Sequence, residues 1–145
     1  MSSSPFPTQT PLNLILPVKP GAAPALRALL TGVGSRPDKP VEHALVALGN
    51  VHHAQFVFFE NDTRLGVLTW YDGPFDDYIL SFVEHIGGIF NAILQFVEGA
   101  EAIVPVELHR DAFLAFISAH DHRSLHAFSA YPGHRLFDIK DALGL

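Results

Sequence analysis

Two apolar runs separated by a polar turn dominate the middle of the chain. Residues 51–60 and 65–71 are rich in β-branched and aromatic side chains, which favour strands. Asn61, Asp62 and Thr63 lie between the runs and supply the residue types that turns prefer. The pattern therefore predicts an antiparallel hairpin.

The stretch after the hairpin carries the signals of a helix start. Asp72 or Gly73 is suited to cap the helix, Pro74 suits the first helical position, and acidic residues follow at 76 and 77. Apolar residues then recur at helical spacing as far as residue 86. We expect Gly87-Gly88 to interrupt this helix before a second apolar helical face begins.

The remaining segments complete an order of elements. We predict strands at residues 12–18 and 125–131, helices at 22–30, 40–48 and 105–120, a loop at 31–39 and a short helical turn in the tail. Residues 1–10 are interpreted as a disordered leader and residues 11–145 as one domain. The order strand, helix, strand, strand, helix, strand predicts an α+β, ferredoxin-like βαββαβ fold with extra helices and the sheet order fourth, first, third, second.

Neither strand of the hairpin has a clean polar face. Val57 and Phe59 share one face, and Phe56 and Phe58 share the other. A sheet in a two-layer monomer normally keeps one face polar, so we expect helices to cover one face and a second subunit the other. Charged residues make up only 17% of the chain, which is low for a small monomer. The predicted assembly is a homodimer, a dimeric α/β barrel, and either face remains a candidate interface.

Composition excludes several classes of function. The net charge is −6 and the nine Lys and Arg residues form no run, so we predict no binding to nucleic acid. No stretch approaches the roughly 20 apolar residues that cross a bilayer, so we predict no membrane partner. The absence of cysteine excludes disulfides and thiol catalysis. Without a signal-peptide pattern at the N-terminus, a cytoplasmic location is expected.

Three stretches resemble an uncharacterised family of ferredoxin-like, dimeric α/β-barrel proteins. They are HHAQFVFFENDTRLGVLTWYDGPFDDYILSFVEHI, LPVKPGAAPALRALL and HAFSAYPGHRLFDI, and the resemblance extends over most of residues 12–140. Gln55 stands where this family commonly has Arg, and Pro74 where it commonly has Ser. The wider superfamily includes cofactor-free monooxygenases, haem-dependent peroxidases, chlorite dismutases and stress-responsive proteins. The resemblance implies the fold and the dimer, and it assigns no chemistry.

Four aromatic or imidazole side chains are candidates for a ligand-binding pocket wall: His52, His53, Trp70 and Tyr131. Strand alternation would send His52 and His53 to opposite faces of the sheet, as it would Trp70 and Tyr71. The polar tips of these rings suit a pocket wall, and imidazole can act as a general base. For all of them the alternative is a purely structural role, and Asp72 is already accounted for as a helix cap.

Metal and haem chemistry have weaker signals. The segment HDHRSLH, residues 120–126, is dense in metal-ligand types, but its spacing fits neither one helix face nor one strand face. His85 or His109 could serve as an axial haem ligand, although no haem-attachment motif is present. We therefore predict no cofactor and no metal site, with haem and metal kept as alternatives.

Two functions from different classes remain. The first is a homodimeric small-molecule binding or accessory module for a small apolar or aromatic ligand. The second is a small oxidoreductase, either a cofactor-free monooxygenase type or haem-dependent, acting in a cavity between the sheet and the helices. A cofactor-free oxygenase needs no metal motif, so the sequence leaves open whether the chain is an enzyme.

Overall fold

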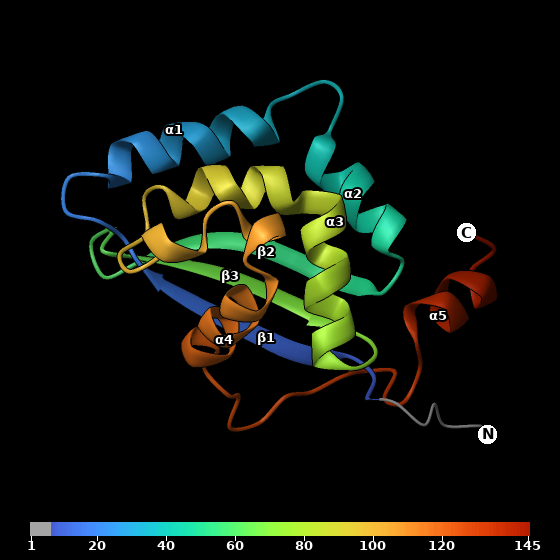
Figure 1. Ribbon diagram of the computed structural model, residues 1–145. Coiled ribbons are helices and arrows are strands. Elements are labelled where there is room, and N and C mark those ends of the chain that lie inside the picture. The colour runs from blue at the N-terminus through green and yellow to red at the C-terminus, as the bar shows by residue number, and fades with distance from the viewer. Residues whose placement is uncertain (1–6) are drawn as a thin grey trace.

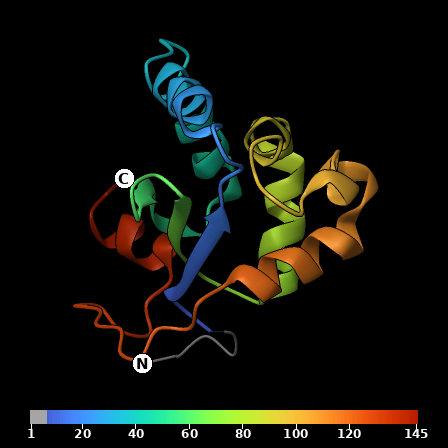
Figure 2. The ribbon, with the colours of Figure 1, turned by 90° about the vertical axis from the view of Figure 1, so that its left-hand side faces the viewer.

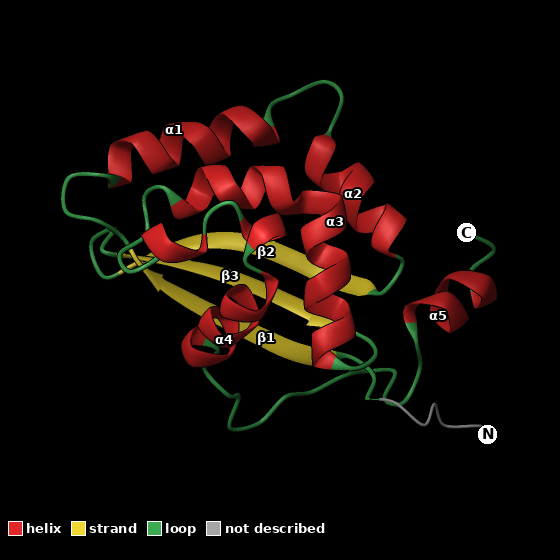
Figure 3. Ribbon diagram, in the orientation of Figure 1, coloured by secondary structure: helices red, strands yellow, loops and turns green. Residues whose placement is uncertain are grey.

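The computed structural model describes residues 7–145 and shows a mixed α+β fold (Figure 1). Three strands form one antiparallel sheet, and the described helices pack around it (Figure 3). The elements in chain order are β1 (Thr10–Pro17), α1 (Ala23–Gly34), α2 (Pro40–Leu48), β2 (Val51–Phe59), β3 (Arg64–Tyr71), α3 (Phe75–Leu94), the 3-10 turns η1 (Glu101–Ile103) and η2 (Val106–Leu108), α4 (Arg110–His120) and α5 (Leu136–Ala142).

The hairpin prediction is confirmed. β2 and β3 pair antiparallel, and β1 pairs with the other edge of β3, so that the sheet order is β1-β3-β2. Glu60, Asn61 and Asp62 take left-handed backbone conformations in the turn, and the amide of Thr63 donates to the carbonyl of Glu60 at 3.2 Å. Asn and Asp tolerate this conformation better than most residues, which explains why the turn forms here.

Alternate residues of the strands form one side of the hydrophobic core. Leu14, Leu65 and Val67 are buried in one core cluster with residues of α3, and Phe56 and Phe58 of β2 pack against this cluster. Tyr71 stacks on Tyr78 of α3 with ring centroids 4.2 Å apart. Edge-on, α3 and α4 lie on one side of the sheet, whereas α5 lies on the other (Figure 2). The face that carries Phe56 and Phe58 is therefore the one that α3 and α4 cover.

The predicted interruption at Gly87-Gly88 is wrong, because α3 is one helix of 20 residues. Figures 1 and 2 show that this helix bends along its length. Glycine pairs are among the few causes of sharp helix bends. Gly87 is buried, and a Cβ placed there would lie 2.6 Å from Oε1 of Glu107, so glycine also permits close contact with η2. Likewise, α1 continues to Gly34, into the predicted loop.

The predicted fourth strand at residues 125–131 does not form. Leu125 is fully exposed and Phe128 is 77% exposed, and the segment has no ladder partner among the described residues. Before it, residues 121–124 contact the edge of β1 through a bridge between Leu14 and Asp121 and through Asn13. The carbonyl of Asn13 accepts the amide of His122 at 2.9 Å, its backbone N–H donates to Oδ1 of Asp121 at 3.0 Å, and its side-chain Nδ2 donates to the carbonyl of His122 and to Oγ of Ser124. The sheet therefore holds three of the four strands that a ferredoxin-like fold requires.

Two further predictions concern the ends of the chain, and one concerns the helix expected at residues 105–120. The part of the predicted disordered leader at residues 1–6 lies outside the described residues, and β1 already begins at Thr10. The short tail helix is confirmed as α5, whereas the helix predicted at 105–120 is divided into η2 and α4. Over residues 7–145, no helix combines the length and the apolar character needed to cross a membrane.

Candidate functional site

A buried carboxylate, Asp72, joins three parts of the chain at the end of the sheet. The residue is 8% exposed and follows the last residue of β3. Its Oδ1 accepts the backbone N–H of Gln9 at 2.8 Å, and its Oδ2 accepts that of Leu136 at 2.7 Å. Nε2 of His52 lies 2.8 Å from Oδ1 and 2.9 Å from Oδ2. A buried charge requires such partners, and here both oxygens are satisfied.

Asp72 was predicted to cap α3, and this prediction is wrong. The cap position is occupied by Pro74, and no side-chain hydrogen bond caps the helix. Asp76 and Asp77 do lie in the first turn, where they complement the helix dipole as expected. The carboxylate of Asp72 is directed instead to the backbone of the N- and C-terminal segments, which sequence spacing alone does not reveal.

A β-bulge brings His52 to this carboxylate. Val51 lies opposite Tyr71 and His53 lies opposite Trp70, so His52 is an extra residue in β2 without a partner in β3. A bulge interrupts the alternation of side chains and changes the direction of the residue at the bulge. The side chain of His52 is only 7% exposed. The expectation that His52 and His53 reach separate faces is wrong, because both line the same pocket.

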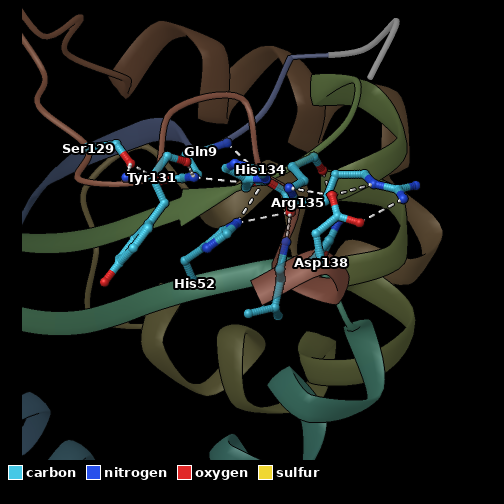
Figure 4. Close-up of polar contacts among 10 residues, drawn as sticks. Gln9, His52, Ser129, Tyr131, His134, Arg135 and Asp138 are labelled. Carbon is cyan, nitrogen blue, oxygen red and sulfur yellow. Dashed lines mark hydrogen bonds and ion pairs between the residues drawn. The ribbon is translucent and has the colours of Figure 1, made fainter. Parts of the chain in front are cut away.

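Gln9 ties the segment before α5 to the start of β1. Its amide Nε2 donates to the carbonyls of Tyr131 at 2.6 Å and His134 at 2.9 Å, and its Oε1 accepts the hydroxyl of Ser129 (Figure 4). Its own backbone is left-handed, with φ of 52°. Within the predicted leader, Gln9 is thus fixed to the rest of the structure.

These contacts form one wall of a pocket of about 360 Å³ at this end of the sheet. We call it the C-terminal pocket, and its lining comes from the strand ends, from the segment that leads into α5 and from α5 itself. The residues that line it are Gln9, His52, His53, Trp70, Phe128, Ser129, Ala130, Tyr131, Leu136 and Ile139.

The structure brings together all four residues named from the sequence, His52, His53, Trp70 and Tyr131. Sequence reasoning missed Gln9 and Phe128, because Gln9 lies in a segment without periodicity and Phe128 was placed in a strand. As expected, Trp70 and Tyr71 point to opposite faces, since Trp70 lines the pocket and Tyr71 is buried in the core.

A second cavity of about 230 Å³ lies between the sheet and helices α1, α2 and α3. We call it the sheet–helix cavity. Its lining residues are Leu30, Val33, Gly34, Val41, Glu42, Leu45, Ala54, Gln55, Phe56, Val67, Thr69, Phe82, Ile86 and Ile89. None of the four candidate residues is among them; they line the C-terminal pocket, which lies between the sheet end and α5.

The polar groups of the sheet–helix cavity are few. Thr69 is buried and accepts the hydroxyl of Tyr78 at 3.2 Å. Burial raises the pKa of Tyr78 to about 12, and the hydrogen bond to Thr69 opposes that rise only in part. Glu42 and Gln55 are exposed residues. The cavity is therefore an apolar space whose one buried hydroxyl pair is already satisfied.

The histidines considered for metal or haem have other contacts. His85, His109 and His120 each place Nδ1 within hydrogen-bond distance of the carbonyl four residues earlier, at 2.9, 2.9 and 2.8 Å. In the part of the chain that the structure describes, no three His, Asp or Glu side chains converge as metal ligands would. The segment of residues 120–126 thus presents no preformed set of ligands.

Comparisons with known proteins add no assignment. No family model, no curated protein and no solved structure matches this chain.

Proposed function

We propose that this chain is a homodimeric small-molecule binding module that holds a small apolar or aromatic ligand in the C-terminal pocket. The observation that carries the proposal is a concave site with aromatic walls that is also lined by His52, an imidazole held in place by the buried carboxylate of Asp72. Ligand sites typically combine a mostly apolar lining with a few oriented polar groups. The sheet–helix cavity has the apolar lining without an oriented polar group that is free to bind.

The size of the pocket limits the ligand. A volume of about 360 Å³ lies near the lower end of the roughly 300–1,000 Å³ usual for ligand pockets. Trp70, Phe128 and Tyr131 offer flat surfaces on which an aromatic ring can stack. A molecule of one or two rings fits these conditions.

The dimer is supported by the sheet face opposite α3 and α4, which α5 covers only at one end. Cross-strand rows on this face place Ile15 and Val57 beside Gly66, and Asn13 and Gln55 beside Leu68. A side chain at Gly66 would collide with the ring of Phe59, so glycine allows that ring to lie across the sheet. An apolar sheet face of this kind is most simply covered by a second copy of the chain.

Membership of the ferredoxin-like, dimeric α/β-barrel family remains part of this proposal. The sheet order β1-β3-β2 matches three of the four strands of that fold, with the free edge of β1 where the fourth would pair. The residues after α4 do begin to approach this edge, through the antiparallel bridge of Asp121 to Leu14.

An oxidoreductase is the second candidate. One observation favours it, because an imidazole held by a buried carboxylate is an arrangement suited to accept a proton from a substrate. His52 lines the C-terminal pocket, so the proposed chemistry is assigned to this pocket rather than to the sheet–helix cavity. Oxygen uptake with a bound aromatic substrate would place this candidate first.

Ligand binding can be tested with the single tryptophan of the chain. Trp70 is the only tryptophan, so its indole N–H gives one resonance in a nitrogen-correlated NMR spectrum. Titration with naphthalene should shift this resonance saturably, and Tyr131→Ala should weaken binding by roughly tenfold through lost aromatic contact.

A matched variant locates the ligand. Leu45→Ala removes apolar surface from the sheet–helix cavity and should leave the naphthalene affinity unchanged. If Leu45→Ala weakens binding and the Trp70 resonance does not move, the ligand occupies the sheet–helix cavity and the proposed site is wrong.

A further inference from the structure

We infer that the C-terminal pocket binds a neutral aromatic molecule that carries a hydroxyl group. This hydroxyl group donates a hydrogen bond to Nδ1 of His52. This inference rests on the proposed function and specifies the ligand class of the same site. It follows from the hydrogen-bonding state of one imidazole and from the charges around the pocket.

The first step concerns the ring nitrogen that faces Asp72. The carboxylate already accepts the N–H groups of Gln9 and Leu136, so it acts there as an ionised acceptor. Nε2 of His52, within 2.9 Å of both oxygens, must carry a hydrogen to make a favourable contact. In the neutral ring the other nitrogen, Nδ1, is then an acceptor.

The second step is that Nδ1 of His52 is unused. Among the described residues this nitrogen has no hydrogen-bond partner. The one side-chain polar atom there that is both fully enclosed and unpaired is Oδ1 of Asn50, so Nδ1 of His52 is not sealed inside the protein. His85, His109 and His120 differ, because each uses Nδ1 in a contact with a carbonyl of its own helix or turn. His52 lines the pocket, so its acceptor is open to a bound molecule.

The third step concerns the position of the ring. The bulge at His52 removes it from the regular ladder, and Asp72 then fixes its plane through two contacts. Bulges often occur beside functional sites, where they direct a side chain. A structural histidine at a strand end would need neither the bulge nor a carboxylate that is itself anchored by two backbone amides.

The fourth step selects a neutral, aromatic ligand. The lining contains neither Lys nor Arg, so nothing in the wall compensates a carboxylate or a phosphate on the ligand. The one carboxylate beside the pocket, that of Asp72, is occupied by its own donors. Trp70, Phe128 and Tyr131 supply the apolar contact surface, and an aromatic hydroxyl supplies the donor that Nδ1 requires.

The experiment compares two probes that share one ring system. β-Naphthol carries a hydroxyl hydrogen, and β-naphthyl methyl ether lacks it. Affinities are measured by titration of the Trp70 indole resonance in the full chain. We expect the wild type to bind β-naphthol about five- to tenfold more tightly than the ether, the size of one buried hydrogen bond.

Variants identify the acceptor. His52→Leu should abolish the preference for β-naphthol while the ether still binds, and His53→Leu, a change at the neighbouring imidazole, should retain it. Because each variant is judged by the ratio of the two affinities, a general loss of stability does not imitate the result. Circular dichroism establishes that each variant is folded before titration.

The outcomes separate this inference from the proposed function. Equal affinity of the wild type for both probes, or an unchanged preference in His52→Leu, overturns the inference while aromatic binding stands. If neither probe moves the Trp70 resonance of the wild type, the proposed binding function itself fails. If the preference for β-naphthol is lost in His53→Leu and kept in His52→Leu, the acceptor is His53, and this result also overturns the inference.

Discussion

At the scale of single residues, Asp72 determines how the two ends of the described chain meet the sheet. Its carboxylate binds the backbone of Gln9 before β1 and of Leu136 at the start of α5, while it also holds the imidazole of His52. No residue of α5 is buried, so apolar packing contributes little to the position of this helix. The hydrogen bond from Leu136 to the buried carboxylate of Asp72 therefore contributes much to holding α5 at the end of the sheet.

Replacement of Asp72 tests this role. Asp72→Ala leaves two backbone N–H groups and an imidazole without their acceptor, and we expect the free energy of unfolding to fall by about 3 kcal/mol. Asp76→Ala is the matched control, because this exposed carboxylate lies in the first turn of α3 and contributes about 0.5 kcal/mol through the helix dipole. Urea unfolding followed by circular dichroism measures both.

Limited proteolysis gives a local readout for the same pair of variants. Cleavage before α5 should accelerate in Asp72→Ala and not in Asp76→Ala. Equal and small losses of stability in the two variants would show that Asp72 acts merely as a charge near a helix end.

At the scale of elements, the sequence located most helices and strands but misjudged one helix break and one strand. Gly87-Gly88 was expected to end a helix, yet the flanking apolar residues bury on a continuous helix that tolerates the pair. Residues 125–131 have the composition of a strand, yet the side chain of Gln9 binds the carbonyl of Tyr131, the last residue of that stretch, and that of His134 beyond it. In both cases a tertiary contact outweighed a local preference.

The two glycines of α3 should respond differently to alanine. Gly88→Ala meets no atom within 4 Å and should stabilise the protein by about 1 kcal/mol, the usual gain in a helix interior. Gly87→Ala should gain little, because the new Cβ displaces the Glu107 carboxylate, which accepts the amide of Asn91 at 2.9 Å.

Thermal unfolding of the two single variants measures this difference. Glu107→Ala combined with Gly87→Ala should recover part of the missing gain, since the obstructing side chain is then absent. Equal stabilisation by Gly87→Ala and Gly88→Ala would contradict the close contact between α3 and η2.

At the scale of the whole molecule, the asymmetry of the sheet is the dominant feature. One face carries the core and the helices, and the other carries Val57, Phe59 and Leu68 without helical cover over most of its length. The sequence indicated that both faces are apolar but left open which one meets a partner. The packing of Phe56 and Phe58 beneath the helices leaves the Val57 face as the proposed interface.

Oligomeric state provides the test of this interface. The wild type should be a dimer, and Val57→Asp should weaken dimerisation by roughly a hundredfold or more, because a buried carboxylate would lose its water without a partner. Val46→Asp makes the same change on α2, where the side chain is 69% exposed, and should leave the dimer intact. Analytical ultracentrifugation measures all three.

A monomeric wild type would end the dimer proposal. Dissociation by Val46→Asp but not by Val57→Asp would instead place the interface on the helical side.

The sequence by itself determined the elements whose signals are local. The sequence predicted β2 and β3 from their β-branched and aromatic residues and from the turn residues at 61–63, and the first half of α3 from helical spacing. These signals come from residues close together in the chain, so they can be recognised without the tertiary structure. It also supplied the four residues His52, His53, Trp70 and Tyr131, which lie around one pocket.

Only the tertiary structure decided how those residues meet. The bulge at His52 arises in the pairing of β2 with β3. The direction of the Asp72 carboxylate and the anchoring of Gln9 depend on hydrogen bonds between residues more than 60 positions apart. Such contacts leave no periodic trace in the sequence, since each involves a single polar group whose partner is set by the packing of the whole chain.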